Sequence, residues 1–141
     1  MTIKQLSIFL ENKSGRLTEV LETLGNEKIN ITALTIADTS EYGILRMIVS
    51  EPENAYRILK QKNFSVNLSE VLSISTPVEA GSFARALRIF SDENISIEYV
   101  YAFSLGNKAI IVLRTENTAV ALEAIKKHKM ELIKASDLYE L

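Results

Sequence analysis

The chain has 141 residues, of which 47% are hydrophobic and 24% charged, and its formal net charge is −2. These values are typical of a globular protein with a hydrophobic core, and the length suits one ordinary domain or two small ones. Positive and negative charges are mixed along the chain, without the basic stripe of a nucleic-acid-binding protein. No apolar run approaches the roughly 18 residues of a membrane span. The absence of cysteine excludes disulfides, thiolate zinc sites and a cysteine nucleophile.

The first half of the chain begins with a predicted strand, helix and strand. Residues 3–10 alternate imperfectly in polarity and predict a strand, and their early charge argues against a signal peptide, so we expect a cytoplasmic protein. Residues 15–26 carry leucine and valine at helical spacing, and Gly25-Asn26 predicts the end of that helix. A long strand is expected to begin at Ile29.

The next elements are a hairpin turn at 40–43, a strand at 44–49, a second helix and a fourth strand. Ser50-Glu51-Pro52-Glu53 has the pattern of a capping box with proline in the first turn of the helix. The fourth strand is expected to begin at Phe64. The first half therefore has the order βαββαβ.

The second half repeats the first at an offset of 66 residues, which places Gly15 on Gly81, Leu21 on Leu87 and Ile29 on Ile95. The repeat predicts strands at 70–76, 95–104, 108–114 and 131–138, and helices at 81–93 and 118–128. We therefore predict an α+β fold of two tandem ferredoxin-like units, residues 1–69 and 70–141. Each unit would be an antiparallel four-stranded sheet with both helices on one face.

Large apolar groups recur along the strand predicted at 95–104. Ile97, Tyr99, Tyr101 and Phe103 are spaced to lie on one side of it. Such a row is most simply buried against the other unit or against another chain.

Few residues suggest catalysis. The single histidine, His128, lies in a lysine-rich last turn of a predicted helix, where its positive charge would complement the helix dipole. The chain contains no nucleophile elbow, phosphate-binding loop or dinucleotide fingerprint, and no cluster with metal-ligand spacing. We therefore expect no enzyme, no metal and no cofactor.

The loop before the first helix, Asn12-Lys13-Ser14-Gly15-Arg16-Leu17, is the strongest candidate site. Either Asn12 or Ser14 can cap the helix, and Gly15 leaves the first-turn N–H groups accessible. These groups, the helix dipole and the charges of Lys13 and Arg16 favour a carboxylate or a phosphate. A capped helix with no ligand is the simpler explanation of the same residues.

Two tandem units with this loop resemble the ACT domains, small regulatory modules that bind amino acids. The loop matches their Asn-x-Pro-Gly pattern with Ser14 in place of proline, and Asn30-Ile31 matches the end of their Gly-x-Asn-Ile element without its glycine. The resemblance implies that backbone N–H groups of Gly15, Arg16 and Leu17 hold a ligand carboxylate. The expected ligand-binding residues are Asn12, Lys13, Ser14, Gly15, Arg16, Leu17, Asn30 and Ile31.

The second loop, Val78 to Phe83, departs from the family pattern. It keeps a glycine at Gly81 but has no polar residue at the position of Asn12, and Glu79 replaces Lys13. We therefore expect the first loop to be the better ligand site, and whether the second loop also binds is left open.

The resemblance implies a non-catalytic regulatory or sensor protein that binds an amino acid at a domain interface. Because two units fill the chain, a homodimer and a separate metabolic enzyme or regulator are the expected partners, without nucleic acid or membrane. The alternatives are a ligand-free structural or protein-interaction module of the same fold, an acylphosphatase-type hydrolase using Arg16, and an RNA-binding module stacking bases on Tyr99 and Tyr101. The sequence does not identify the amino acid.

Overall fold

The computed structural model describes residues 2–11, 13–38 and 41–139, which form two compact units. The first unit comprises Lys4–Ser69 with Ser136–Leu141, and the second comprises Met1–Ile3 with Glu70–Ala135. The division of the chain into two ACT-like domains, residues 1–69 and 70–141, stays a prediction. The candidate sites described below each lie within one unit.

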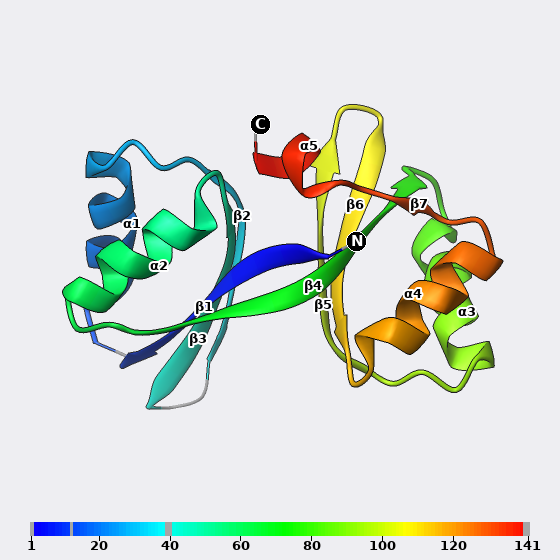
Figure 1. The fold of residues 1–141 in the computed structure, drawn as a ribbon, viewed down its shortest axis with the longest axis horizontal. Helices are drawn as coiled ribbons and strands as arrows, with labels where there is room; N and C mark the ends of the chain where they lie inside the picture. Colours follow the sequence, from blue (N-terminus) through cyan, green and yellow to red (C-terminus); the bar gives the residue numbers. More distant parts are fainter. Residues whose placement is uncertain (1, 12, 39–40, 140–141) are drawn as a thin grey trace. The chain divides into compact units, whose positions relative to one another are not determined.

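The first unit contains β1 (Ile3–Glu11), α1 (Arg16–Asn26), β2 (Ile31–Asp38), β3 (Tyr42–Val49), α2 (Pro52–Gln61) and the beginning of β4 (Ser65–Pro77). Its strand order is β2-β3-β1-β4, and β3 pairs antiparallel with both β1 and β2. Both helices cover one face of this sheet (Figure 1).

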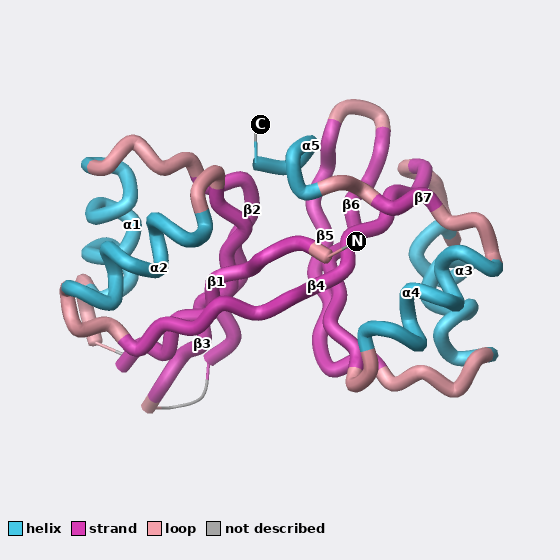
Figure 2. The backbone as a smooth tube through the Cα atoms, in the orientation of Figure 1, coloured by secondary structure: helices cyan, strands magenta, loops and turns pink. Residues whose placement is uncertain are grey.

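The second unit continues β4, which is one long strand in Figure 2, and adds α3 (Ser82–Asp92), β5 (Ile97–Leu105), β6 (Lys108–Thr115), α4 (Thr118–Lys127) and β7 (Glu131–Leu132). Its strand order, β5-β6-β4-β7, corresponds element by element to that of the first unit. The predicted α+β fold of two ferredoxin-like units with antiparallel sheets is therefore confirmed. Within the part of the chain that the structure describes, no helix has the length and apolar character to span a bilayer.

The repeat extends to the backbone conformation. Gly15 and Gly81 precede the first helix of their units with φ of 87° and 85°. Residues just after the helices also have positive φ, and they fall into two pairs at the same offset of 66 residues: Lys28 with Asn94, and Asn63 with Lys129. Because positive φ is uncommon for residues other than glycine, these matches show that the helix ends themselves are repeated.

Each of the first four helices ends in a Schellman motif with an apolar residue after the left-handed one. In α1 the Lys28 N–H donates to Gly25 O and the Ile29 N–H donates to Leu24 O, both at 3.0 Å. The predicted end of the helix at Gly25-Asn26 is confirmed, because α1 ends at Asn26, but the left-handed residue that follows is Lys28 and not a glycine. Gly25 lies inside α1, and Lys28 takes the left-handed position because burial of Ile29 against the core fixes the turn.

We expect Gly25→Ala to raise the free energy of unfolding by about 0.5–1 kcal/mol, because alanine loses less backbone entropy than glycine within a helix. A Cβ at this position would meet nothing within 4 Å. Gly15→Ala is the matched control and should destabilise the protein, since Gly15 has a φ of 87°. Urea unfolding of both variants tests this, and equal effects of the two substitutions would contradict it.

Each unit has its own hydrophobic core between sheet and helices. In the first unit Leu6, Ile8 and Leu10 of β1 face Val20 and Leu24 of α1. The core of the second unit is formed by residues of the equivalent elements: Leu72 and Ile74 of β4, Phe90 of α3, Ile111 and Leu113 of β6, and Ile125 of α4. The same sequence periodicities therefore build two separate cores.

The strand predicted at 131–138 is wrong in its second half. β7 covers only Glu131–Leu132, and the Ile133 N–H donates once more to Ser73 O at 2.9 Å. The chain then forms a short helix, α5 (Ala135–Tyr139), because the apolar alternation stops after Ile133 and Leu138 is instead fully buried in the first unit.

The predicted apolar row on β5 also requires a correction. A register shift between Ile97 and Tyr99 places Ile97 opposite Thr115 and against the helix-side core, whereas Tyr99 lies opposite Arg114. Tyr99, Tyr101 and Phe103 therefore share the other face of the sheet without Ile97. The first unit has the same irregularity between Ile31 and Ala33, at the corresponding positions.

Candidate functional site

The first candidate loop surrounds the start of α1. Gly15 is the N-cap residue, so Ser14 does not take the cap position predicted for it, and the prediction for Asn12 lies outside the described residues. The turn is closed by two backbone bonds, from the Lys13 N–H to Glu11 O at 2.8 Å and from the Arg16 N–H to Lys13 O at 3.3 Å. The Arg16 N–H, one of the three groups expected to hold a ligand, is thus already engaged.

The positive charges of this loop have partners within it. Lys13 Nζ lies 2.8 Å from Glu11 Oε2, and the hydrogen bond from Lys13 lowers the pKa of Glu11. Arg16 Nη1 lies 3.0 Å from Glu19 Oε2, and its guanidinium lies 4.6 Å from the ring centroid of Phe64. An anionic ligand at Gly15 would therefore share these two cations with Glu11 and Glu19.

Asn30 and Ile31, the other predicted site residues, lie beyond the opposite end of α1. The helix has 11 residues, and at about 1.5 Å per residue it separates Gly15 from Asn30 by roughly 16 Å. Asn30 is exposed, and Ile31 packs beside the core. Within the first unit the structure therefore does not bring Asn30 to the loop.

Asn30 is nevertheless held in place. Its N–H donates to Ser50 Oγ at 3.0 Å, and the Ser50 N–H donates to Asn30 O at 2.9 Å. This exchange uses the hydroxyl that the sequence assigned to a capping box. That prediction is wrong, because Glu51 is the N-cap residue of α2 and makes no side-chain capping bond.

The second loop has the same backbone and different charges. Gly81 is the N-cap residue of α3 at a φ of 85°, with no side-chain cap. Arg85 Nη2 lies 2.8 Å from Glu79 Oε1 and 3.3 Å from Ser82 Oγ. The Arg85 guanidinium reaches over the glycine, since a Cβ at Gly81 would lie 3.0 Å from Arg85 Nη1.

A cavity of about 530 Å³ opens beside this second loop. Val78 and Phe83, large apolar side chains that are 64% and 47% exposed, contribute to its wall. The other lining residues are Pro77, Glu79, Ala80, Gly81, Ser82, Ala84, Ser104 and Ala109. The volume lies in the range of small-molecule sites, and the wall is mainly apolar with start-of-helix N–H groups nearby.

This cavity was not predicted from the sequence. The available signal was the replacement of Asn12 by Val78 at the equivalent loop position, which makes the second loop more apolar than the first. Among residues 2–11, 13–38 and 41–139, no group of three or more acidic or histidine side chains is arranged to hold a metal ion.

The repeated ferredoxin-like units with a glycine before the first helix of each define the class of protein. The chain belongs to the family described as the ACT domain pair, which it matches over residues 1–141. The predicted resemblance is thereby confirmed. A comparison with curated proteins gave no match.

Solved structures agree with this assignment. Protein BT0572 from Bacteroides thetaiotaomicron is 50% identical, with a TM-score of 0.95 over 100% of this chain and 98% of its own. The ligand-free regulatory subunit of aspartate kinase from Thermus thermophilus is 14% identical, with a TM-score of 0.63 over 88% of this chain and 91% of its own. The corresponding subunit from Thermus flavus is 13% identical, with a TM-score of 0.62 over 88% and 90%. The last two show the fold alone.

Proposed function

We propose that this ACT domain pair is a non-catalytic regulatory protein that binds an amino acid through the loop of residues 12–17. The observation that carries the proposal is the start of α1 at Gly15, where a helix whose N-cap residue is a glycine presents its first turn on an exposed loop. The N–H groups of Gly15 and Leu17 would receive the ligand carboxylate. Asn30 and Ile31 would approach the ligand from a neighbouring copy, because α1 separates them from the loop of their own unit.

This arrangement requires a homodimer, and it suits a cytoplasmic protein that acts on a separate enzyme or regulator without cofactor, nucleic acid or membrane. Neighbours of the same fold named as regulatory subunits of aspartate kinase support the regulatory role. A ligand that orders a loop between two units would shift the population of assembled states, and a partner could bind one of those states preferentially.

The cavity beside Gly81 makes the second loop a candidate for a second ligand molecule. Its wall of Pro77, Val78 and Phe83 suits an apolar ligand side chain. Glu79 and Arg85, which pair with each other, offer one charge of each sign to a zwitterion. The two loops would then differ in the ligand that they prefer.

The test is a thermal-shift screen against the twenty amino acids, with the wild type, Gly15→Val and Gly81→Val each compared with its own ligand-free form. A ligand at 100 times its dissociation constant stabilises the folded protein by about 2.7 kcal/mol. We expect at least one amino acid to raise the Tm of the wild type, and Gly15→Val to abolish that shift. Loss of the shift only in Gly81→Val would assign the site to the second loop.

A flat screen of folded wild-type protein would contradict the proposal. It would favour the alternative function, a ligand-free protein-interaction module of the same fold. The observation in favour of that alternative is the exposed apolar surface of the first unit, where Phe9 and Tyr42 are 48% and 42% exposed and stack at 4.8 Å between ring centroids.

A further inference from the structure

The last helix of the chain, α5, is an integral part of the first unit. Leu138 is fully buried, and a five-residue helix could not bury a leucine without a surrounding structure. Ser136–Leu141 group with Lys4–Ser69, not with the residues that precede them in sequence. α5 therefore makes tertiary contacts with β1 and β2, which lie more than a hundred residues earlier in the sequence.

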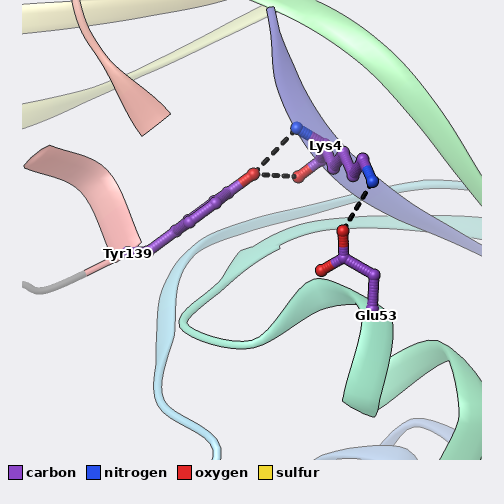
Figure 3. Close-up of polar contacts among 3 residues, drawn as sticks. All are labelled: Lys4, Glu53 and Tyr139. Atoms are coloured by element: carbon purple, nitrogen blue, oxygen red, sulfur yellow. Dashed lines mark hydrogen bonds and ion pairs between the residues drawn. The ribbon is translucent and has the colours of Figure 1, made fainter. Parts of the chain in front are cut away.

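The Tyr139 hydroxyl makes hydrogen bonds with both backbone polar groups of Lys4. It accepts from the Lys4 N–H at 2.8 Å and donates to the Lys4 C=O at 3.3 Å, as Figure 3 shows. Partial burial raises the pKa of Tyr139, so the hydroxyl stays protonated at neutral pH and can make both bonds. Lys4 lies two residues before the first β1–β3 pair, Leu6 with Met47, and Tyr139 thus fixes the beginning of β1.

The side chain of Lys4 adds a separate contact to α2. Its Nζ pairs with Glu53 Oε1, and this hydrogen bond lowers the pKa of Glu53 (Figure 3). Both side chains are about half exposed or more, at 48% and 63%. The ion pair does not involve the Tyr139 hydroxyl and therefore supplies a control for it.

A second contact joins α5 to the beginning of β2. Thr32 Oγ1 donates to Leu138 O at 3.0 Å. Thr32 is the extra residue of the register shift between Ile31 and Ala33, so its conformation is not fixed by a regular ladder position. In the second unit the corresponding residue is Glu98, which instead pairs with Arg114 at 3.6 Å.

Two sets of contacts therefore fix the beginning of β2. The Asn30 N–H donates to the Ser50 hydroxyl and Asn30 O accepts from the Ser50 N–H, and two residues further on Thr32 donates to Leu138 O of α5. We propose that α5 is a positioning element for the ligand site, in which Thr32, Leu138 and Tyr139 fix the segment of residues 30–33 in the conformation that meets the ligand. This inference rests on the proposed function, because it assigns Asn30 to ligand binding.

When α5 is released from the first unit, the affinity for the ligand should fall. Without the bond to Leu138 the irregular segment has more conformations, and only a fraction of them presents Asn30 to the ligand. A partner that captures the C-terminal residues would thereby weaken ligand binding, and by reciprocity a bound ligand would oppose that capture.

The experiment compares Tyr139→Phe and Thr32→Val with two controls. Tyr139→Phe keeps the ring and removes both bonds to Lys4, and Thr32→Val removes the donor at nearly constant volume. Glu53→Gln breaks only the ion pair of Lys4. Ile58→Val weakens the core of the same unit, in which Ile58 is buried, without touching α5.

Two quantities are measured in each variant: hydrogen exchange of the amides of residues 30–33 without ligand, and affinity for the amino acid found in the thermal-shift screen. We expect exchange of these amides to rise about two- to tenfold in Tyr139→Phe and Thr32→Val, corresponding to the loss of a typical hydrogen bond. Ligand affinity should fall by a similar factor in both. Neither quantity should change in Glu53→Gln, and Ile58→Val should leave affinity unchanged despite its lower Tm.

Unchanged exchange at residues 30–33 would overturn the inference, and so would faster exchange with unchanged affinity. The failure of the proposed function is a different result. If no amino acid binds the wild type, ligand positioning falls with that function, while the exchange measurement still reports whether α5 holds the beginning of β2.

Discussion

Replacement of Phe90 by alanine is expected to lower the free energy of unfolding by about 3–5 kcal/mol. Among the residues that the structure describes, Phe90 is the largest fully buried side chain, and it belongs to the core of the second unit. Its carbonyl also accepts the Ile95 N–H at 2.8 Å in the Schellman motif that ends α3. The substitution leaves a cavity between α3 and the sheet. This cavity cannot collapse, because the backbone hydrogen bonds of the helix and of the sheet hold both walls in place.

Urea unfolding followed by circular dichroism measures this loss. Leu87→Ala, three residues earlier on the same helix and only partly buried, is the control and should cost less. A loss below about 1 kcal/mol for Phe90→Ala would show that the α3–sheet contact contributes little to the stability of the second unit.

Leu138→Ala is expected to cost about 2–5 kcal/mol, an effect as large as that of a central core residue although Leu138 lies three residues from the end of the chain. Terminal residues usually fray, but Leu138 is buried, and hydrogen bonds of Tyr139 with Lys4 and of Thr32 with Leu138 O join α5 to the first unit. The loss should be accompanied by faster hydrogen exchange in β1 and β2 of the first unit.

Asp137→Ala is the matched control, because Asp137 is an exposed neighbour on the same helix and should change stability by less than about 0.5 kcal/mol. Equal, small effects of the two substitutions would mean that α5 is not held against the first unit in solution. In that case the positioning role inferred for it would also fail.

The alternating and helical periodicities, together with the offset of 66 residues, were sufficient to predict the two units and most element positions. The helix ends were harder, because Lys28 and Lys129 adopt a left-handed conformation that residue preference assigns to glycine or asparagine. Burial of the following apolar residue decides these turns. The register shift at Glu98 could not be predicted either, because it depends on the pairing of β5 with β6 and not on the residue type.

The candidate site was predicted in part. Gly15 has the left-handed backbone conformation that glycine favours. The ion pairs of Lys13 and Arg16 were not predicted, because they depend on the exact side-chain positions of Glu11 and Glu19, which sequence periodicity gives only approximately. The docking of α5 could not be predicted, because it depends on contacts between segments far apart in the sequence. For the cavity beside Gly81, the apolar residues of its loop were visible in the sequence, but the contribution of Ser104 and Ala109 to its wall was not.

The long strand β4 constrains what insertions the chain can tolerate. Even-numbered residues of each half of this strand belong to a core, Val66 to that of the first unit and Leu72 and Ile74 to that of the second. One extra residue between positions 69 and 70 would reverse the inside and outside of one half of the strand relative to the other, whereas two extra residues would preserve the alternation. Variation in the length of this strand should therefore be tolerated in steps of two residues, and an odd insertion should persist only where a bulge restores the phase.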